Sequence, residues 1–288
     1  MSLNTLEEIA AYIVSEGKGI LAADESNPTC GKRFDSIGVE STENNRRDYR
    51  EMLFRSKGMK GNIGGVILFD ETIRQNAKDG TPLINIIEDQ GALPGIKVDK
   101  GLQPIGDSEE TVTVGLEGLD ERLKEYAAMG AKFTKWRAVI KIGDGMPSQE
   151  CIDANMKALA DYAKLVQDNG MVPMVEPEVL MDGGHSIDDC YEATERSLQS
   201  LFTHLIANEV NIKGTILKPN MVTSGSTAEK QAGVQEVAEK TVDCLLKNVP
   251  ASLPGITFLS GGQSDIHATA HLDAMNKLGG LLWKVSFS

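Results

Sequence analysis

One lysine in this sequence is placed where it could act as a nucleophile. Lys218 directly follows the mostly apolar run Thr215–Leu217, and the proline after it favours an extended backbone at the lysine. A lysine that projects from an apolar strand loses hydration, and a nearby cation also disfavours the charged form. An uncharged amine can attack a carbonyl carbon and form a covalent intermediate. The spacing therefore predicts a nucleophilic amine at Lys218.

Other charged residues also lie at or near the ends of apolar runs, and they carry both signs. They are Asp24, Lys97, Lys135, Arg137, Glu176 and Glu178. Residues two apart on a strand point to the same side, so Lys135 shares its side with Arg137. Each charge taken alone is more often a solvated loop residue, because charged side chains are mostly exposed. Inward charges of both signs on five strands are instead typical of a catalytic site.

A glycine-rich turn lies between the last strand but one and a predicted helix. It reads Ser260-Gly261-Gly262-Gln263-Ser264. Unpaired backbone amides near a helix N-terminus favour an anion, because the N–H groups and the helix dipole both attract negative charge. Such a turn is more often a plain loop, but its position is where barrels often bind phosphate. The turn is therefore a candidate phosphate site.

Eight short apolar runs must position these residues. Each run has the β-branched and apolar content of a parallel strand that is buried on both faces. The runs are Gly19–Ala23, Gly65–Phe69, Gly95–Val98, Phe133–Ile142, Val172–Glu176, Gly214–Leu217, Gly255–Leu259 and Leu281–Phe287. Amphipathic segments alternate with these runs. They predict helices over Met1–Gly17, Ser41–Lys57, Pro82–Asp89, Leu119–Met129, Pro147–Asp168, Ser186–Glu209, Thr227–Lys247 and Ser264–Lys277.

The strict alternation of strands and helices predicts a (β/α)8 TIM barrel, formed as one domain by residues 1–288. In such barrels the chemistry takes place at the C-terminal ends of the strands, which is where the charges fall. An open doubly wound sheet is the alternative, but no G-x-G-x-x-G motif follows the first predicted strand.

Composition restricts the partners and the compartment. The net charge of −13 argues against nucleic acid and anionic membranes, which select for basic surfaces. The N-terminal segment lacks the basic and apolar regions of a signal peptide, and no run approaches the roughly 18 apolar residues of a membrane span. The four cysteines are far apart and form no C-x-x-C pair, which indicates reduced thiols. We therefore expect a cytoplasmic protein.

Seven segments closely resemble the class I fructose-bisphosphate aldolases, the family that includes the animal and plant enzymes. They occur in the family's order and are Gly17–Ser26, Gly64–Phe69, Gly95–Gly101, Lys135–Arg137, Val172–Glu178, Leu217–Thr223 and Gly255–Ser264. The resemblance implies cleavage of fructose 1,6-bisphosphate to dihydroxyacetone phosphate and glyceraldehyde 3-phosphate without a cofactor. It also implies a homo-oligomer, commonly a tetramer in this family.

The resemblance also assigns roles to the residues named above. Lys218 resembles the Schiff-base lysine that attacks the C2 ketone, and Glu176 resembles the acid/base that removes water from the carbinolamine. Asp24 resembles the carboxylate that handles the C4 hydroxyl, and Lys135 the cation that orients the carboxylates. Contacts to the two phosphates and the sugar are expected from Ser26, Thr29, Lys97, Arg137 and Arg33 at one end, and from Ser260 and Gly261 at the other.

Two departures from the family pattern accompany the resemblance. Thr29 stands where the family usually has serine, which keeps a hydroxyl group. The sequence stops at Ser288, whereas the family continues with a Tyr-Gly-Arg segment, a last helix and a tail that ends in tyrosine. From this we expect an eighth strand that is partly uncovered and a phosphate site that lacks its strongest donor.

Three other functions are compatible with parts of the sequence. His267 and His271 lie four residues apart on a predicted helix and could share a metal in a metal-dependent aldolase. Asp265 and Asp273 beside them indicate a wet polar face instead, so no catalytic metal is expected. An incomplete barrel that binds sugar phosphates without cleaving them is a second alternative. The third keeps the chemistry but uses a related ketose phosphate, such as tagatose bisphosphate or fructose 1-phosphate.

Overall fold

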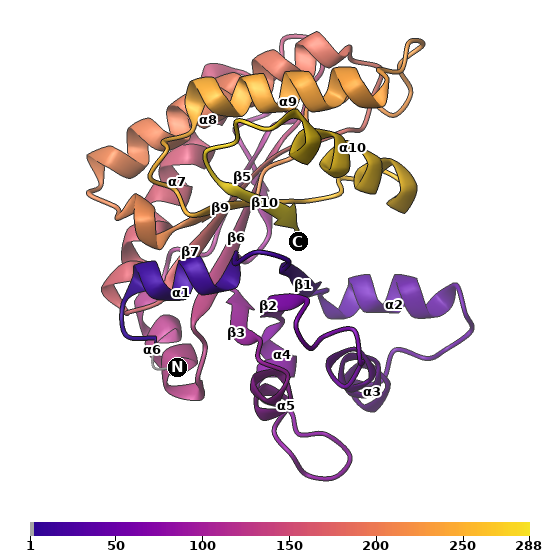
Figure 1. Cartoon of the computed structure of the whole chain (residues 1–288), viewed down its shortest axis with the longest axis vertical. Helices are drawn as coiled ribbons and strands as arrows, with labels where there is room; N and C mark the ends of the chain where they lie inside the picture. The colour runs from indigo at the N-terminus through magenta and orange to yellow at the C-terminus, as the bar shows by residue number, and fades with distance from the viewer. Residues whose placement is uncertain (1–2) are drawn as a thin grey trace.

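A parallel sheet of eight strands forms the centre of the computed structural model, which describes residues 3–288 (Figure 1). In sheet order the strands are β1 (Gly19–Ala23), β2 (Ile63–Leu68), β3 (Leu93–Lys97), β6 (Phe133–Ile140), β7 (Val172–Val179), β8 (Ile216–Leu217), β9 (Gly255–Phe258) and β10 (Lys284–Phe287). Each strand pairs in parallel with the next, and β10 returns to contact β1. The sheet is thus a nearly closed barrel, and the predicted (β/α)8 fold is confirmed.

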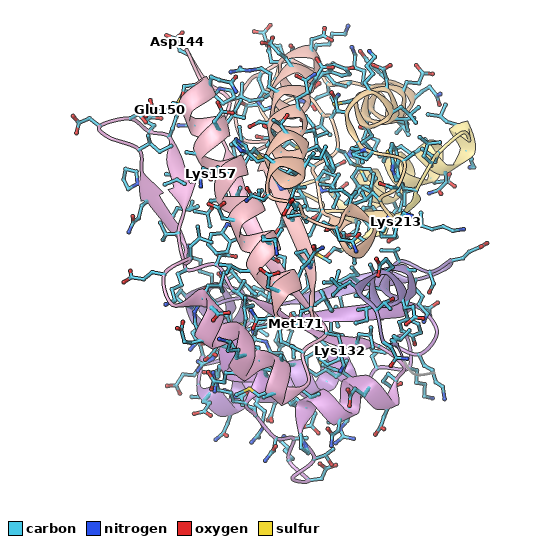
Figure 2. All side chains as sticks on the ribbon, turned by 90° about the vertical axis from the view of Figure 1, so that its left-hand side faces the viewer. Lys132, Asp144, Glu150, Lys157, Met171 and Lys213 are labelled. Carbon is cyan, nitrogen blue, oxygen red and sulfur yellow. The ribbon has the colours of Figure 1, made fainter. Side chains whose placement is uncertain are left out.

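Ten α-helices accompany the strands in the described part of the chain. They are α1 (Leu6–Ile13), α2 (Asn27–Asp35), α3 (Glu43–Phe54), α4 (Asp70–Ile73), α5 (Leu83–Asp89), α6 (Leu119–Met129), α7 (Gln149–Asp168), α8 (Ile187–Ala207), α9 (Val234–Asn248) and α10 (Asp265–Leu278). Consecutive helices from α7 to α10 pack side by side. Figure 2 shows α7 running along the outside of the barrel, with Lys157 on its outer surface.

Local capping explains where the long helices begin and end. The Ser186 side chain accepts from the Asp189 N–H in a capping box that starts α8. Asn169 and Gly170, which has a φ of 73°, end α7 as the sequence predicts. Pro147 was expected in the first turn of α7, but the helix begins at Gln149 because the Ser148 side chain caps it by accepting from the Cys151 N–H.

Several boundaries differ from the predictions. The strand expected to end at Glu176 continues to Val179, because β7 stays paired with β6 as far as Ile140. α9 begins at Val234 rather than at Thr227. The helices α2 and α4 and the hairpin of β4 (Leu102–Pro104) and β5 (Thr111–Thr113) were not predicted. Of the predicted N-terminal helix over Met1–Gly17, Leu6–Ile13 is helical, while Met1 and Ser2 lie outside the described residues.

The last strand of the barrel is less covered than the others. Lys284 is exposed and Val285–Phe287 are half-buried, whereas each of the other seven barrel strands has at least one buried residue in the described chain. The expectation of a partly uncovered eighth strand is therefore met in this structure.

An apolar cluster joins α1 to the interior of the barrel at the N-terminal ends of the strands. It contains Ile9, Ala10, Ile13, Val14, Ile20, Ile67, Phe133, Val172, Met174 and Ile216. The close approach of α1 to β2 depends on a glycine. A Cβ added at Gly64 would lie 2.1 Å from the backbone oxygen of Ile13. Since a backbone atom cannot rotate away as a side chain can, α1 can lie here only if residue 64 has no side chain.

The Gly64→Ala substitution is expected to destabilise the protein by about 1–3 kcal/mol, because it overpacks the contact between α1 and β2. Urea-induced unfolding measures this change. Gly31→Ala in α2 is the matched control: its added Cβ would lie 3.8 Å from Ser41, an ordinary contact, and alanine should raise helix stability by up to about 1 kcal/mol. Equal unfolding midpoints for the two variants would contradict this account.

Candidate active site

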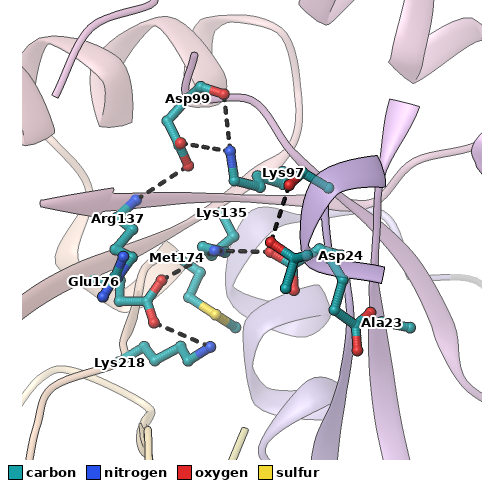
Figure 3. Close-up of polar contacts among 12 residues, drawn as sticks. Ala23, Asp24, Lys97, Asp99, Lys135, Arg137, Met174, Glu176 and Lys218 are labelled. Carbon is teal, nitrogen blue, oxygen red and sulfur yellow. Dashed lines mark hydrogen bonds and ion pairs between the residues drawn. The ribbon is translucent and has the colours of Figure 1, made fainter. Parts of the chain in front are cut away.

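Four charged side chains from different strands meet in the barrel (Figure 3). The Lys135 Nζ lies 2.8 Å from the Asp24 Oδ2 and 3.2 Å from the Glu176 Oε2. The other oxygen of Glu176, Oε1, lies 3.1 Å from the Lys218 Nζ. The exposed fractions of these side chains are between 5% and 13%. Cations and carboxylates thus alternate in the order Asp24, Lys135, Glu176, Lys218.

The strand register explains why these residues meet. Asp24 directly follows β1, while Lys135 and Glu176 lie within the paired strands β6 and β7. Lys218 directly follows β8, and its N–H donates to the Val175 carbonyl at 2.9 Å, one residue before Glu176. The register sets Lys135 opposite Lys97, the last residue of β3, and sets Val175, which precedes Glu176, opposite Leu217, which precedes Lys218. Figure 3 shows the Lys218 amine directed at the Glu176 carboxylate.

The ion pairs decide the protonation states of three of these groups. Burial by itself would raise the pKa of Asp24 and of Glu176, but the charges of Lys135 and Lys218 outweigh it and lower both values. Burial would likewise lower the pKa of Lys135, but Asp24 and Glu176 reverse that effect and raise it. Lys135 is therefore a protonated cation, and both carboxylates are ionised at neutral pH.

A cavity of about 770 Å³ adjoins this cluster and is lined by most of the predicted substrate contacts. Asp24, Ser26, Thr29, Lys97, Lys135 and Arg137 all line it. The Ser26 and Thr29 hydroxyls lie 3.0 Å apart at the start of α2, and the Ser26 side chain makes no capping bond. Two hydroxyls and the free N–H groups of a helix start suit an anionic group. The structure therefore brings six predicted site residues together.

Two acidic residues, neither of which was predicted to be catalytic or to bind substrate, hold cations of the site. The Lys97 Nζ lies 2.5 Å from the Asp99 Oδ1, and Asp99 also accepts from the Arg137 N–H at 3.4 Å. The Arg137 side chain forms an ion pair with Glu178. Asp99 lies two positions after Lys97, the last residue of β3, and a charge so close to the end of a strand was the signal that could have identified it.

Three predicted contacts lie elsewhere. Arg33, Ser260 and Gly261 are not among the described residues that line the cavity. Arg33 is directed instead at Glu25, with which it forms an ion pair of 2.9 Å. Ser260 is exposed and follows Leu259, whose N–H donates to the Pro219 carbonyl at 3.1 Å. The glycine-rich turn therefore starts beside Pro219, the neighbour of Lys218.

The histidine and cysteine side chains have other surroundings. His271 is buried and its Nδ1 lies 2.6 Å from the Gln263 Oε1, so the wet face expected here was wrong for His271. Within residues 3–288, no group of three or more histidine, cysteine, aspartate or glutamate side chains is arranged to hold a metal ion. The cysteines Cys30, Cys151, Cys190 and Cys244 are free and buried. No helix in this part of the chain is long and apolar enough to cross a membrane.

The family comparison agrees with this geometry. The model of the family "Fructose-bisphosphate aldolase class-I" matches residues 5–288. The chain belongs to this family. Its members are carbon–carbon lyases that use a lysine Schiff base, and a buried lysine beside a carboxylate is the arrangement that this chemistry requires.

Similar aldolases cover nearly the whole chain. It is 57% identical to a probable class 1 fructose-bisphosphate aldolase of Xanthomonas campestris pv. campestris, over 100% of this chain and 86% of the relative. It is 52% identical to the cytosolic fructose-bisphosphate aldolase 6 of Arabidopsis thaliana, over 97% and 78% of the two chains. A co-crystal structure of the Plasmodium falciparum aldolase with TRAP and a small-molecule inhibitor superposes with a TM-score of 0.97. It is 46% identical and covers 98% of this chain and 82% of that chain.

Replacing Lys135 with methionine should lower the free energy of unfolding at pH 7 by about 3–5 kcal/mol, because two buried carboxylates lose their shared cation. The lowered pKa values of Asp24 and Glu176 stabilise the native protein above their unfolded values near pH 4, and that contribution is lost as the pH falls through the folded values. Between pH 7 and 5 the wild type therefore keeps this contribution. The variant regains stability there, because Asp24, which has lost its ion pair with Lys135, takes up a proton.

The difference in free energy of unfolding between wild type and variant should therefore be smaller at pH 5 than at pH 7. Urea unfolding of both proteins at the two pH values measures this change. Lys57→Met, at an exposed position, is the control and should change stability little at either pH. A difference between wild type and Lys135→Met that stays constant across this pH range would contradict the proposed charge arrangement.

Proposed function

We propose that this chain catalyses the reversible cleavage of fructose 1,6-bisphosphate to dihydroxyacetone phosphate and glyceraldehyde 3-phosphate, with Lys218 as the Schiff-base residue. The observation that carries the proposal is the buried Lys218 amine, 3.1 Å from Glu176 in a cluster of alternating charges. The amine adds to the C2 ketone, and loss of water from the carbinolamine gives an iminium ion. This ion accepts the electron pair when the C3–C4 bond breaks.

Glu176 is placed to transfer the protons of the first steps. Its Oε1 faces the Lys218 amine and its Oε2 faces Lys135. A carboxyl group within hydrogen-bond reach of the amine can protonate the departing hydroxyl of the carbinolamine, and as a carboxylate it can later remove a proton from the water that adds to the iminium. Because the pKa of Glu176 is lowered, the carboxylate form predominates before substrate binds, and the proton must come from the reacting groups themselves.

Asp24 is placed to act on the other half of the sugar. Its carboxylate lines the cavity and is ionised because Lys135 and Lys218 outweigh the effect of burial. In the proposed step it removes the proton of the C4 hydroxyl as the C3–C4 bond breaks. The C4 oxygen becomes the aldehyde of glyceraldehyde 3-phosphate, and the electron pair passes into the iminium to form an enamine. Protonation of this enamine and hydrolysis release dihydroxyacetone phosphate and the free amine.

The protein has a net charge of −13, so it can bind the phosphate groups only where hydrogen-bond donors and cations are concentrated locally. We assign Ser26, Thr29, Lys97 and Arg137, which line the cavity, to one end of the substrate, and the turn at Ser260 and Gly261 to the other. Arg33 can join the first group only by giving up its ion pair with Glu25. Each charge-assisted contact to a phosphate adds about 1.5–3 kcal/mol to binding.

The compartment and the assembly are inferred more indirectly. Relatives such as the Arabidopsis thaliana enzyme are named cytosolic, which supports a cytoplasmic location for this chain. A homo-oligomer, commonly a tetramer in this family, and a single barrel domain over residues 1–288 stay predictions. Size-exclusion chromatography with light scattering determines the assembly directly.

Sodium borohydride added with dihydroxyacetone phosphate should reduce the iminium and leave a stable covalent adduct on Lys218. Peptide mass spectrometry locates the adduct. The Lys218→Met variant should form none and should not cleave fructose 1,6-bisphosphate, because Lys135, the other buried amine beside Glu176, is held as a cation by Asp24 and Glu176. An adduct only on other lysines, or on none, would refute the assignment.

Lys141→Met is the matched control, since Lys141 directly follows the same strand as Lys135 but its side chain is 45% exposed. This variant should keep both the adduct and the cleavage activity. Cleavage should also survive chelation of divalent metals, which separates the lysine mechanism from a metal-dependent one. Saturable binding of the sugar bisphosphate without cleavage would favour a barrel that only binds, and faster cleavage of another ketose phosphate would change the substrate.

A further inference from the structure

We infer that Arg50 is a positioning residue for the cleavage step: it holds the backbone on both sides of Asp24 and so fixes the carboxylate that acts on the C4 hydroxyl. Arg50 lies on α3 and is 0% exposed. Its Nε donates to the Ala23 carbonyl at 3.1 Å, and its Nη2 donates to the Glu25 carbonyl. One rigid guanidinium therefore bridges the two residues that flank Asp24. The inference rests on the role proposed for Asp24.

The backbone at Asp24 needs such support. The pairing of β1 with β2 ends at Ala23 and Leu68, and α2 begins only at Asn27. Asp24 thus lies in a short connection between a strand and a helix, where neither element orders the chain. Hydrogen bonds from Arg50 to the carbonyls of residues 23 and 25 replace the missing strand pairing. They hold Asp24 where its carboxylate reaches Lys135 at 2.8 Å.

Stability alone gives no reason for an arginine at this position. A guanidinium is always charged, and its removal from water costs several kcal/mol before pairing. The Arg50 Nη2 is 3.8 Å from the Glu25 Oε2, and Glu25 also pairs with Arg33 at 2.9 Å. The Arg50 Nη1 is buried without a hydrogen-bond partner. The side chain thus keeps one unpaired donor nitrogen, while Nε and Nη2 donate to the backbone carbonyls on either side of Asp24.

Arg50→Met should separate the two halves of the reaction. Formation of the borohydride adduct on Lys218 with dihydroxyacetone phosphate should be slowed far less than cleavage, because Glu176 keeps its ion pairs with Lys135 and Lys218 in the variant. The kcat for cleavage of fructose 1,6-bisphosphate should fall by on the order of 100-fold, the cost of a misplaced reacting group, with KM nearly unchanged. Arg50→Lys, whose single ammonium can reach only one carbonyl at a time, should give an intermediate kcat.

Arg46→Met is the matched control. Arg46 lies one turn earlier on α3, is 8% exposed and pairs with Glu71 at 2.6 Å, but it does not contact the Asp24 backbone. It should lose comparable stability in urea and keep its kcat. If Arg50→Met does not fold, the same comparison is made with Arg50→Lys and Arg46→Lys.

The outcomes distinguish the two levels of the account. Normal cleavage by the Arg50 variant would overturn the inference, and so would parallel losses of adduct and cleavage that match those of the Arg46 variant. A wild-type chain that forms no adduct on Lys218 would overturn the proposed function, and the inference with it.

Discussion

The ammonium group of Lys135 holds together two carboxylates that would otherwise repel each other inside the barrel. Asp24 and Glu176 come from strands on opposite sides of Lys135, and each contacts its Nζ within 3.2 Å. Buried charges are costly unless they are paired, so the geometry of each of these side chains depends on the others. Lys218 joins this array through the second oxygen of Glu176. The nucleophile is therefore oriented by the same electrostatic balance that keeps the carboxylates ionised.

The fold supplies this balance by placing one charged residue on each of several parallel strands. β6 and β7 contribute Lys135 and Glu176, while Asp24 and Lys218 directly follow β1 and β8. The apolar cluster that joins α1 to the barrel closes the other end of the strands. Arg50 positions the backbone of the same site, because it donates to the carbonyls of Ala23 and Glu25 in the segment between β1 and α2. Apolar packing thus closes one end of the barrel, and the charged cluster lies toward the other.

Much of this architecture could be predicted from the sequence, for physical reasons. Strands buried on both faces are continuous apolar runs, and all eight were located. The helix α4 has a single turn, and α2 buries only Cys30 and Phe34 and contains a glycine, so neither shows a clear helical period. The β4 and β5 strands have three residues each, too few to show an alternating pattern, so these elements were missed. β7 was ended too early because Pro177 and two glutamates resemble a loop, whereas in the barrel this segment is buried and paired with β6.

Some residues of the site could also be predicted from the sequence, and others could not. Lys218, Lys135 and Glu176 could be identified because each interrupts or follows an apolar strand, and the structure brings them together. Arg50 could not, since an arginine in an amphipathic helix is usually exposed and its partners lie 25 and 27 positions away in sequence. The roles of the individual residues were implied by the family resemblance, and their geometry is compatible with those roles.

A double-mutant cycle on the cleavage rate tests the central claim that the charged cluster acts as one unit. The single-turnover rate is measured for wild type, Lys135→Met, Glu176→Gln and the double variant. Strong coupling is expected: the double variant should be no slower than the slower single variant, because either change already disrupts the shared array. Additive losses, with the double variant slower by the product of the two single effects, would contradict it.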